Sequence, residues 1–133
     1  LWNASSKRVL MIGLSSGSWA RIVASNPAVE SLTIVELNPG YVELASRHVE
    51  TASIMRDPKI TIVADDGRRW LGANKDVRFD AIIQNTTFHF RANVSNLLSR
   101  EYLELVFSRL TPKGTFFYNT TMSPRSIAPR PHL

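Results

Sequence analysis

Short apolar runs alternate along this chain with segments whose apolar residues have helical spacing. Five of these runs predict strands, at residues 8–12, 32–35, 60–63, 79–83 and 114–118. The first run is apolar on both faces and is halted by Gly13, as expected of a strand buried inside a sheet. Strands and helices that alternate in this way are typical of βαβ units, so the pattern predicts an α/β fold with a parallel sheet covered by helices.

The segments between the strands carry helix signals. A helix at about residues 18–25 must end before Pro27, because proline cannot continue it. The next helix starts with Asn38 as N-cap and Pro39 in its first turn, where the missing N–H does no harm. Its predicted apolar face consists of Tyr41, Val42, Leu44, Ala45 and Val49.

Two further helices precede the fourth and fifth strands. A short one is expected around residues 66–71, and Ser99 can cap a longer one. The predicted apolar face of the longer helix consists of Tyr102, Leu103, Val106, Phe107 and Leu110. Residues 111–114 contain Pro and Gly and predict a turn into the fifth strand.

Composition excludes several classes of function. The chain has 133 residues, about the length of one domain, and 44% of them are hydrophobic, which is enough for a core. It has no cysteine, which excludes disulfides, thiolate metal sites and a cysteine nucleophile. The net charge of +5 comes from scattered basic residues, so we do not expect a nucleic-acid partner. No apolar run approaches the roughly 20 residues of a membrane-spanning helix.

The end of the chain differs in composition from the rest. Residues 122–133 contain three prolines and two arginines without apolar periodicity. We therefore expect a folded domain at residues 1–121 and an extended or disordered tail at residues 122–133. The sequence begins with Leu1 instead of Met, so we expect a domain excised from a longer protein. We expect it on the cytoplasmic side of the cell, and the parent protein is free to carry membrane segments elsewhere.

The turn after the first strand is the first candidate for chemistry. Residues 13–17 stand where a nucleotide-binding fold places its glycine-rich loop, and Gly13, Ser15 and Gly17 would let the backbone approach a ligand. Taken alone, the spacing of this loop is a weak signal and favours a plain tight turn. Glu36 follows Gly13 by 23 residues at the end of the second strand. A carboxylate there can accept hydrogen bonds from ribose hydroxyls, or it can help to cap the next helix.

The third and fourth strands also end in polar residues. Asp66, with Gly67, follows the third strand, where its carboxylate could accept a bond from an exocyclic amine such as that of adenine, or cap a helix. Asn85 follows the fourth strand and can hold a ligand, but an amide cannot serve as a general base. His89 is a candidate base or a plain loop residue. Spacing assembles no metal-ligand cluster, so we expect no metal site.

Several motifs line up in order and spacing. They lie at residues 9–13, 29–39, 57–68, 79–83 and 98–102. Together they resemble the spermidine synthase (aminopropyltransferase) family, within the class of S-adenosylmethionine-dependent methyltransferase folds, from residue 7 to residue 120. The resemblance implies a Rossmann-like, doubly wound parallel sheet of strand order 3-2-1-4-5, truncated relative to the full seven-strand methyltransferase fold.

The resemblance also implies roles for particular residues. In the family, the position of Glu36 holds the ribose, that of Leu37 packs on adenine, and those of Asp66 and Gly67 meet the adenine edge. The loop at residues 13–17 passes beside the sulfur. The implied cofactor is S-adenosylmethionine or its decarboxylated form. Members of the family transfer the aminopropyl group of the decarboxylated form to an amine such as putrescine.

The acidic motif of the family is absent. Where the family has Asp-Ser-x-Asp-Pro, residues 85–89 read NTTFH, and the first loop has serines where the family carries an Asp. Asn85 stands at the position of the family's base, and His89 is the remaining candidate catalytic residue. An amine must lose its proton to attack, and an amide cannot take it, so these changes argue against polyamine synthesis by this chain.

Three functions stay open. The first is a spermidine synthase-like transferase domain that binds S-adenosylmethionine or its decarboxylated form. The second is a methyltransferase, which depends more on positioning than on a strong base. The third is a non-catalytic nucleoside-binding module of a larger protein. The expected partner in each case is a small-molecule nucleoside, while the acceptor and a homodimer stay open.

Overall fold

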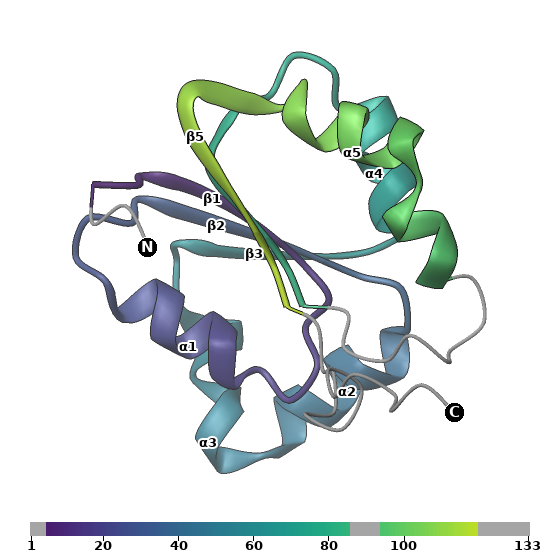
Figure 1. Cartoon of the computed structure of the whole chain (residues 1–133). Helices are drawn as coiled ribbons and strands as arrows, with labels where there is room; N and C mark the ends of the chain where they lie inside the picture. Colours follow the sequence, from purple (N-terminus) through teal and green to yellow (C-terminus); the bar gives the residue numbers. More distant parts are fainter. Residues whose placement is uncertain (1–4, 86–93, 120–133) are drawn as a thin grey trace, which may run out of the picture.

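A parallel sheet of five strands runs through the centre of the computed structural model, which describes residues 5–85 and 94–119 (Figure 1). The strands are β1 (Arg8–Ile12), β2 (Ser31–Glu36), β3 (Ile60–Ala64), β4 (Phe79–Gln84) and β5 (Leu110–Tyr118). Their order is β3-β2-β1-β4-β5, and each neighbouring pair is parallel. The predicted fold class and strand order are therefore confirmed.

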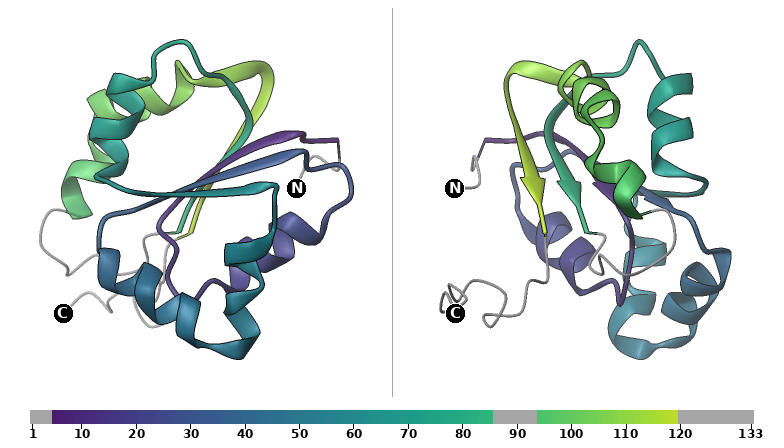
Figure 2. Two further views of the ribbon diagram at one scale, coloured as in Figure 1. Left: turned by 180° about the vertical axis from the view of Figure 1, so that it is seen from behind. Right: turned by 45° about the vertical axis from the view of Figure 1, so that its right-hand side comes forward.

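Helices cover both faces of the sheet. They are α1 (Ser18–Ser25), α2 (Pro39–Arg47), α3 (Val49–Ala52), α4 (Gly67–Ala73) and α5 (Arg100–Phe107), with 3₁₀ turns η1 (Ile54–Arg56) and η2 (Val94–Leu98). In two orientations, α1, α2 and α3 lie on one face, and α4 and α5 lie on the other (Figures 1 and 2). The chain is thus doubly wound, as the resemblance implied.

The core consists of two apolar layers, one on each face of the sheet. Successive side chains of a strand point to opposite faces. Accordingly, Val9 and Met11 of β1 belong to the layer beneath α1 and α2, whereas Leu10 and Ile12 belong to the layer beneath α4 and α5. Each such side chain stabilises the fold by about 1.5–3 kcal/mol when it is fully buried. The near-continuous apolar sequence of β1 is therefore what a central strand requires.

Asn38 and Ser99 cap two of the helices, as the sequence predicted. Asn38 Oδ1 accepts a hydrogen bond from the Gly40 amide at 2.9 Å at the start of α2. Ser99 Oγ accepts from the Tyr102 amide at 3.2 Å at the start of α5. A side-chain oxygen satisfies one of the amides that a helix start leaves unpaired, which fixes where each helix begins.

The predicted apolar face of the second helix is partly wrong. The helix ends at Arg47, because His48 is extended at φ −87° and ψ 126°, and a separate short helix, α3, follows. Val49 consequently points to solvent and is 93% exposed, and Leu44 is 50% exposed. Thr51 is buried instead, and its hydroxyl donates to the Ala45 carbonyl at 2.8 Å.

The predicted turn before the fifth strand is instead an irregularity inside β5. Leu110 is paired with Phe79 and Thr115 with Ala81, so five steps along β5 match two along β4. Leu110 therefore belongs to the strand, not to the apolar face of the last helix. A Cβ on Gly114 would lie 2.9 Å from the Phe79 carbonyl oxygen, so this position requires glycine.

The predictions about the end of the chain fall on residues outside the described ranges. The tail at residues 122–133 and the domain boundary at residue 121 both lie there. Within residues 5–85 and 94–119, none of the helices has the length and apolar content needed to cross a membrane.

Candidate functional site

The carboxyl ends of the strands meet at one edge of the sheet, where backbone pairing continues one residue beyond β1, β3, β4 and β5. The amides beyond the strands donate from Gly13 to Val35 O (2.9 Å), Asp65 to Glu36 O (3.0 Å), Asn85 to Ile12 O (2.8 Å) and Asn119 to Gln84 O (2.9 Å). With the strand register, these bonds put residues 64, 36, 13, 85 and 119 at one level. The structure thus brings the predicted strand-end residues to one edge, where open α/β sheets bind ligands.

The first loop is shaped by backbone conformations that favour glycine. Gly13 and Gly17 have φ of 95° and 82°, and Ser15 has φ of 52°. A Cβ on Gly17 would also lie 2.7 Å from Ile54 Cδ1, so this glycine lets α1 begin tightly against η1. No side chain caps α1, which leaves its first amides available to a ligand at this edge.

Glu36 joins the first loop to the start of α2. Its side chain is buried, with the residue 6% exposed. Oε2 accepts from the Leu14 amide at 2.7 Å, and Oε1 accepts from the Asn38 amide at 2.8 Å. Each carboxylate oxygen has two acceptor sites, so Glu36 fixes both loops and keeps capacity for a ligand hydroxyl. The cap of α2 is Asn38 itself, and Leu37, 70% exposed, follows Glu36 directly.

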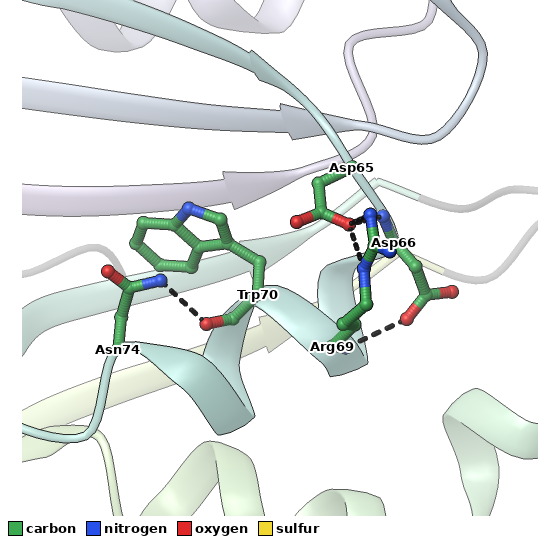
Figure 3. Close-up of polar contacts among 5 residues, drawn as sticks. All are labelled: Asp65, Asp66, Arg69, Trp70 and Asn74. Atoms are coloured by element: carbon green, nitrogen blue, oxygen red, sulfur yellow. Dashed lines mark hydrogen bonds and ion pairs between the residues drawn. The ribbon is translucent and has the colours of Figure 1, made fainter.

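The end of β3 carries two carboxylates in different environments (Figure 3). Asp65 Oδ1 accepts from the Asp66 amide and from Arg69 Nε, both at 2.6 Å, and forms an ion pair with Arg69. Asp66 Oδ1 accepts from the Arg69 amide at 2.8 Å and caps α4. At the other end of α4, Asn74 Nδ2 donates to the Trp70 carbonyl at 2.8 Å. The helix cap predicted for Asp66 is confirmed, while its adenine contact stays a prediction.

Gly67 has a packing role in the structure. It is buried in the first turn of α4, and a Cβ there would lie 2.6 Å from Ile12 Cγ2. The absence of a side chain lets the start of α4 lie against the end of β1. Contact of Gly67 with a nucleoside stays a prediction.

Asn85 pairs with a residue that the sequence analysis did not identify. Asn119 directly follows β5, and its Nδ2 donates to Asn85 Oδ1 at 3.0 Å. Asn85 is 5% exposed. The signal that could have found Asn119 is its place after a predicted strand, the same signal that pointed to Glu36, Asp66 and Asn85. His89 lies outside the described residues.

A buried tyrosine packs against the last residue of β4, on the face of the sheet that α4 and α5 cover. Tyr102 of α5 donates to Gln84 Oε1 at 2.6 Å, and neither residue is exposed. Burial is the largest cause that raises the pKa of Tyr102 above its ordinary value. Tyr102 therefore stays protonated at neutral pH and acts as a fixed donor that positions β4. Among the described residues, no group of three or more His, Asp or Glu side chains could hold a metal ion.

Comparison with known proteins decides the family. Residues 2–124 match the model of the spermine/spermidine synthase domain. The chain belongs to this family. It is 32% identical over 111 residues to the spermidine synthase of Dictyostelium discoideum, covering 83% of this chain and 38% of the relative. It is also 32% identical over 114 residues to the polyamine aminopropyltransferase of Corynebacterium efficiens, covering 83% of this chain and 22% of the relative.

Solved structures give the same family and fold. A spermidine synthase in complex with the transition-state analogue AdoDATO matches with a TM-score of 0.76 and 26% identity, covering 84% of this chain and 38% of that chain. Human methyltransferase-like protein 13 in complex with SAH matches with a TM-score of 0.69 and 20% identity, covering 81% of this chain and 51% of that chain, which shows the shared fold alone. The present chain thus spans less than half the length of its spermidine synthase relatives.

Proposed function

We propose that this chain is a spermidine synthase-like transferase domain that binds S-adenosylmethionine or its decarboxylated form along the carboxyl edge of its sheet. The observation that carries the proposal is the Glu36 carboxylate. It is buried at the end of β2, held by the Leu14 and Asn38 amides, and retains acceptor sites. Family membership and the likeness to a spermidine synthase bound to AdoDATO support the same ligand class.

The proposed ligand crosses the edge from β3 to β4. Adenine lies near Asp66 and Leu37, the ribose hydroxyls donate to Glu36, and the sulfur lies beside residues 13–17. The reacting end then lies at Asn85, between β1 and β4. Asn85 is an amide and cannot take a proton from an amine, so attack by an ammonium acceptor would need a base from elsewhere. This amide favours methyl transfer as the second candidate, because a methyl acceptor can react without a strong base at this position.

Calorimetric titration of the full chain with methylthioadenosine and with S-adenosylhomocysteine tests the proposal. Both ligands keep adenine and ribose, so we expect both to bind. Glu36→Gln removes the charge from the ribose contact, and we expect affinity for methylthioadenosine to fall by about tenfold, which corresponds to about 1.4 kcal/mol. Glu43→Gln, on the exposed face of α2, is the matched control and should leave affinity unchanged. Absence of binding by both ligands would refute the proposal.

A further inference from the structure

The two polar atoms of the Asn85 side chain have different partners. Oδ1 accepts from Asn119 Nδ2 at 3.0 Å, whereas Nδ2 is buried without an acceptor from the described part of the chain. Buried donors are nearly always paired, because an unpaired one loses its hydrogen bonds to water without replacement. An unpaired donor beside a proposed ligand therefore indicates a group that the ligand supplies.

Asn85 lies on the same face of the sheet as Glu36. Side chains two residues apart on a strand share a face, and Ile83 and Ile34 both belong to the apolar layer beneath α1 and α2. The backbone amide of Asn85 also donates to the carbonyl oxygen of Ile12, which directly precedes the first loop. Nδ2 is shielded from solvent in the free chain, so a ligand reaches it through a local rearrangement of this edge.

We propose that Asn85 Nδ2 donates to an oxygen of the ligand and thereby selects S-adenosylmethionine over its decarboxylated form. The inference rests on the proposed function, which leads the tail of the ligand from the first loop to the end of β4. The two ligands differ in the α-carboxylate, and this group supplies acceptor oxygens. The decarboxylated tail ends in an ammonium, which only donates, so it would place a donor against the Nδ2 donor of Asn85. Asn85 thus reverses the preference that a carboxylate would have at this position.

Asn119 is a positioning residue in this arrangement. Its Nδ2 occupies Asn85 Oδ1, so the other end of the Asn85 amide is the one left for the ligand. In Asn119→Asp, the new carboxylate only accepts, so Asn85 must turn its Nδ2 toward residue 119 and present Oδ1 to the ligand. A merely structural role for Asn119 would change both ligand affinities equally, whereas a positioning role changes their ratio.

Calorimetric titrations of the full chain with three ligands test the inference. Methylthioadenosine lacks the tail and reports nucleoside binding alone. We expect S-adenosylmethionine to bind at least about tenfold more tightly than its decarboxylated form, as a charge-assisted hydrogen bond allows. Asn85→Asp should reverse the order, and Asn119→Asp should reduce the ratio. Asn26→Asp is the matched control, because its new carboxylate still accepts from the Ala28 amide and lies far from this edge.

The outcomes separate this inference from the proposed function. If methylthioadenosine binds but the parent chain binds both tailed ligands equally or prefers the decarboxylated one, the Asn85 inference is wrong and the proposed function stands. If none of the three ligands binds, both are wrong. The ratio of the affinities for S-adenosylmethionine and its decarboxylated form is measured on the parent chain and requires no variant. The test therefore stands even if thermal unfolding shows that the Asn85→Asp protein does not fold.

Discussion

Gly17 should be far less tolerant of alanine than Gly72. At Gly17, φ is +82° and a Cβ would lie 2.7 Å from Ile54 Cδ1 and 3.1 Å from Thr51 Cγ2. The left-handed backbone costs a non-glycine residue roughly 1–2 kcal/mol, and overpacking costs about 1–3 kcal/mol more, of which the flexible end of Ile54 relieves a part. We therefore expect Gly17→Ala to lower the free energy of unfolding by about 2–4 kcal/mol.

Gly72 is the matched control, with the opposite expected sign. It lies inside α4, and a Cβ there meets no atom within 4 Å. Gly72→Ala should therefore raise the free energy of unfolding by about 0.5–1 kcal/mol through helix propensity. Urea unfolding followed by circular dichroism measures both variants against the parent chain. A Gly17→Ala variant within about 0.5 kcal/mol of the parent would refute the assignment of this loop conformation.

Two further variants test polar contacts. Glu36→Gln keeps the shape of the side chain but can accept from only one of the two amides that Glu36 binds, so urea unfolding should show a loss of about 1.5–3 kcal/mol; an unchanged midpoint would contradict this contact. The backbone amide of Arg8 donates to Asp80, and this bond is the largest cause that holds the pKa of the Asp80 carboxyl below its ordinary 3.8. The charged carboxylate therefore stabilises the fold at pH values above 3.8, and this stabilisation is lost as the pH falls through the lower pKa of the folded state. Asp80→Asn should therefore lose less stability than the parent chain between pH 5 and about pH 2, and parallel pH profiles would contradict this.

Local chemistry explains why much of the fold was predictable. Strand runs, the Asn38 and Ser99 caps and the ends of α1 depend on neighbouring residues, so the sequence contains their signals. The break after Arg47 and the irregularity in β5 depend on long-range packing. Thr51, for example, is buried because its hydroxyl reaches Ala45 across the turn between α2 and α3, which no periodic pattern indicates.

The site divides in the same way. Glu36 is the last residue of β2 and Asp66 lies two residues beyond β3, so both were predictable from where the apolar runs end. The bonds that define their environments, from Leu14 to Glu36 and between Asn119 and Asn85, join residues 22 and 34 positions apart and follow only from the parallel register. For Asp66 the sequence left a helix cap and a ligand contact equally open, and the structure shows the cap.

The irregularity in β5 gives this chain a place where its length can vary. Between the Leu110–Phe79 and Thr115–Ala81 pairs, the extra residues leave the ladder near the start of β4, at the opposite end of the sheet from Asn119. The pairing of Thr115 to Tyr118 with β4 sets the position of Asn119 along the sheet, whatever the number of residues between Leu110 and Thr115. Provided that Gly114 is kept, this segment can accept a spectroscopic probe or a short peptide tag while the amide pair keeps its register.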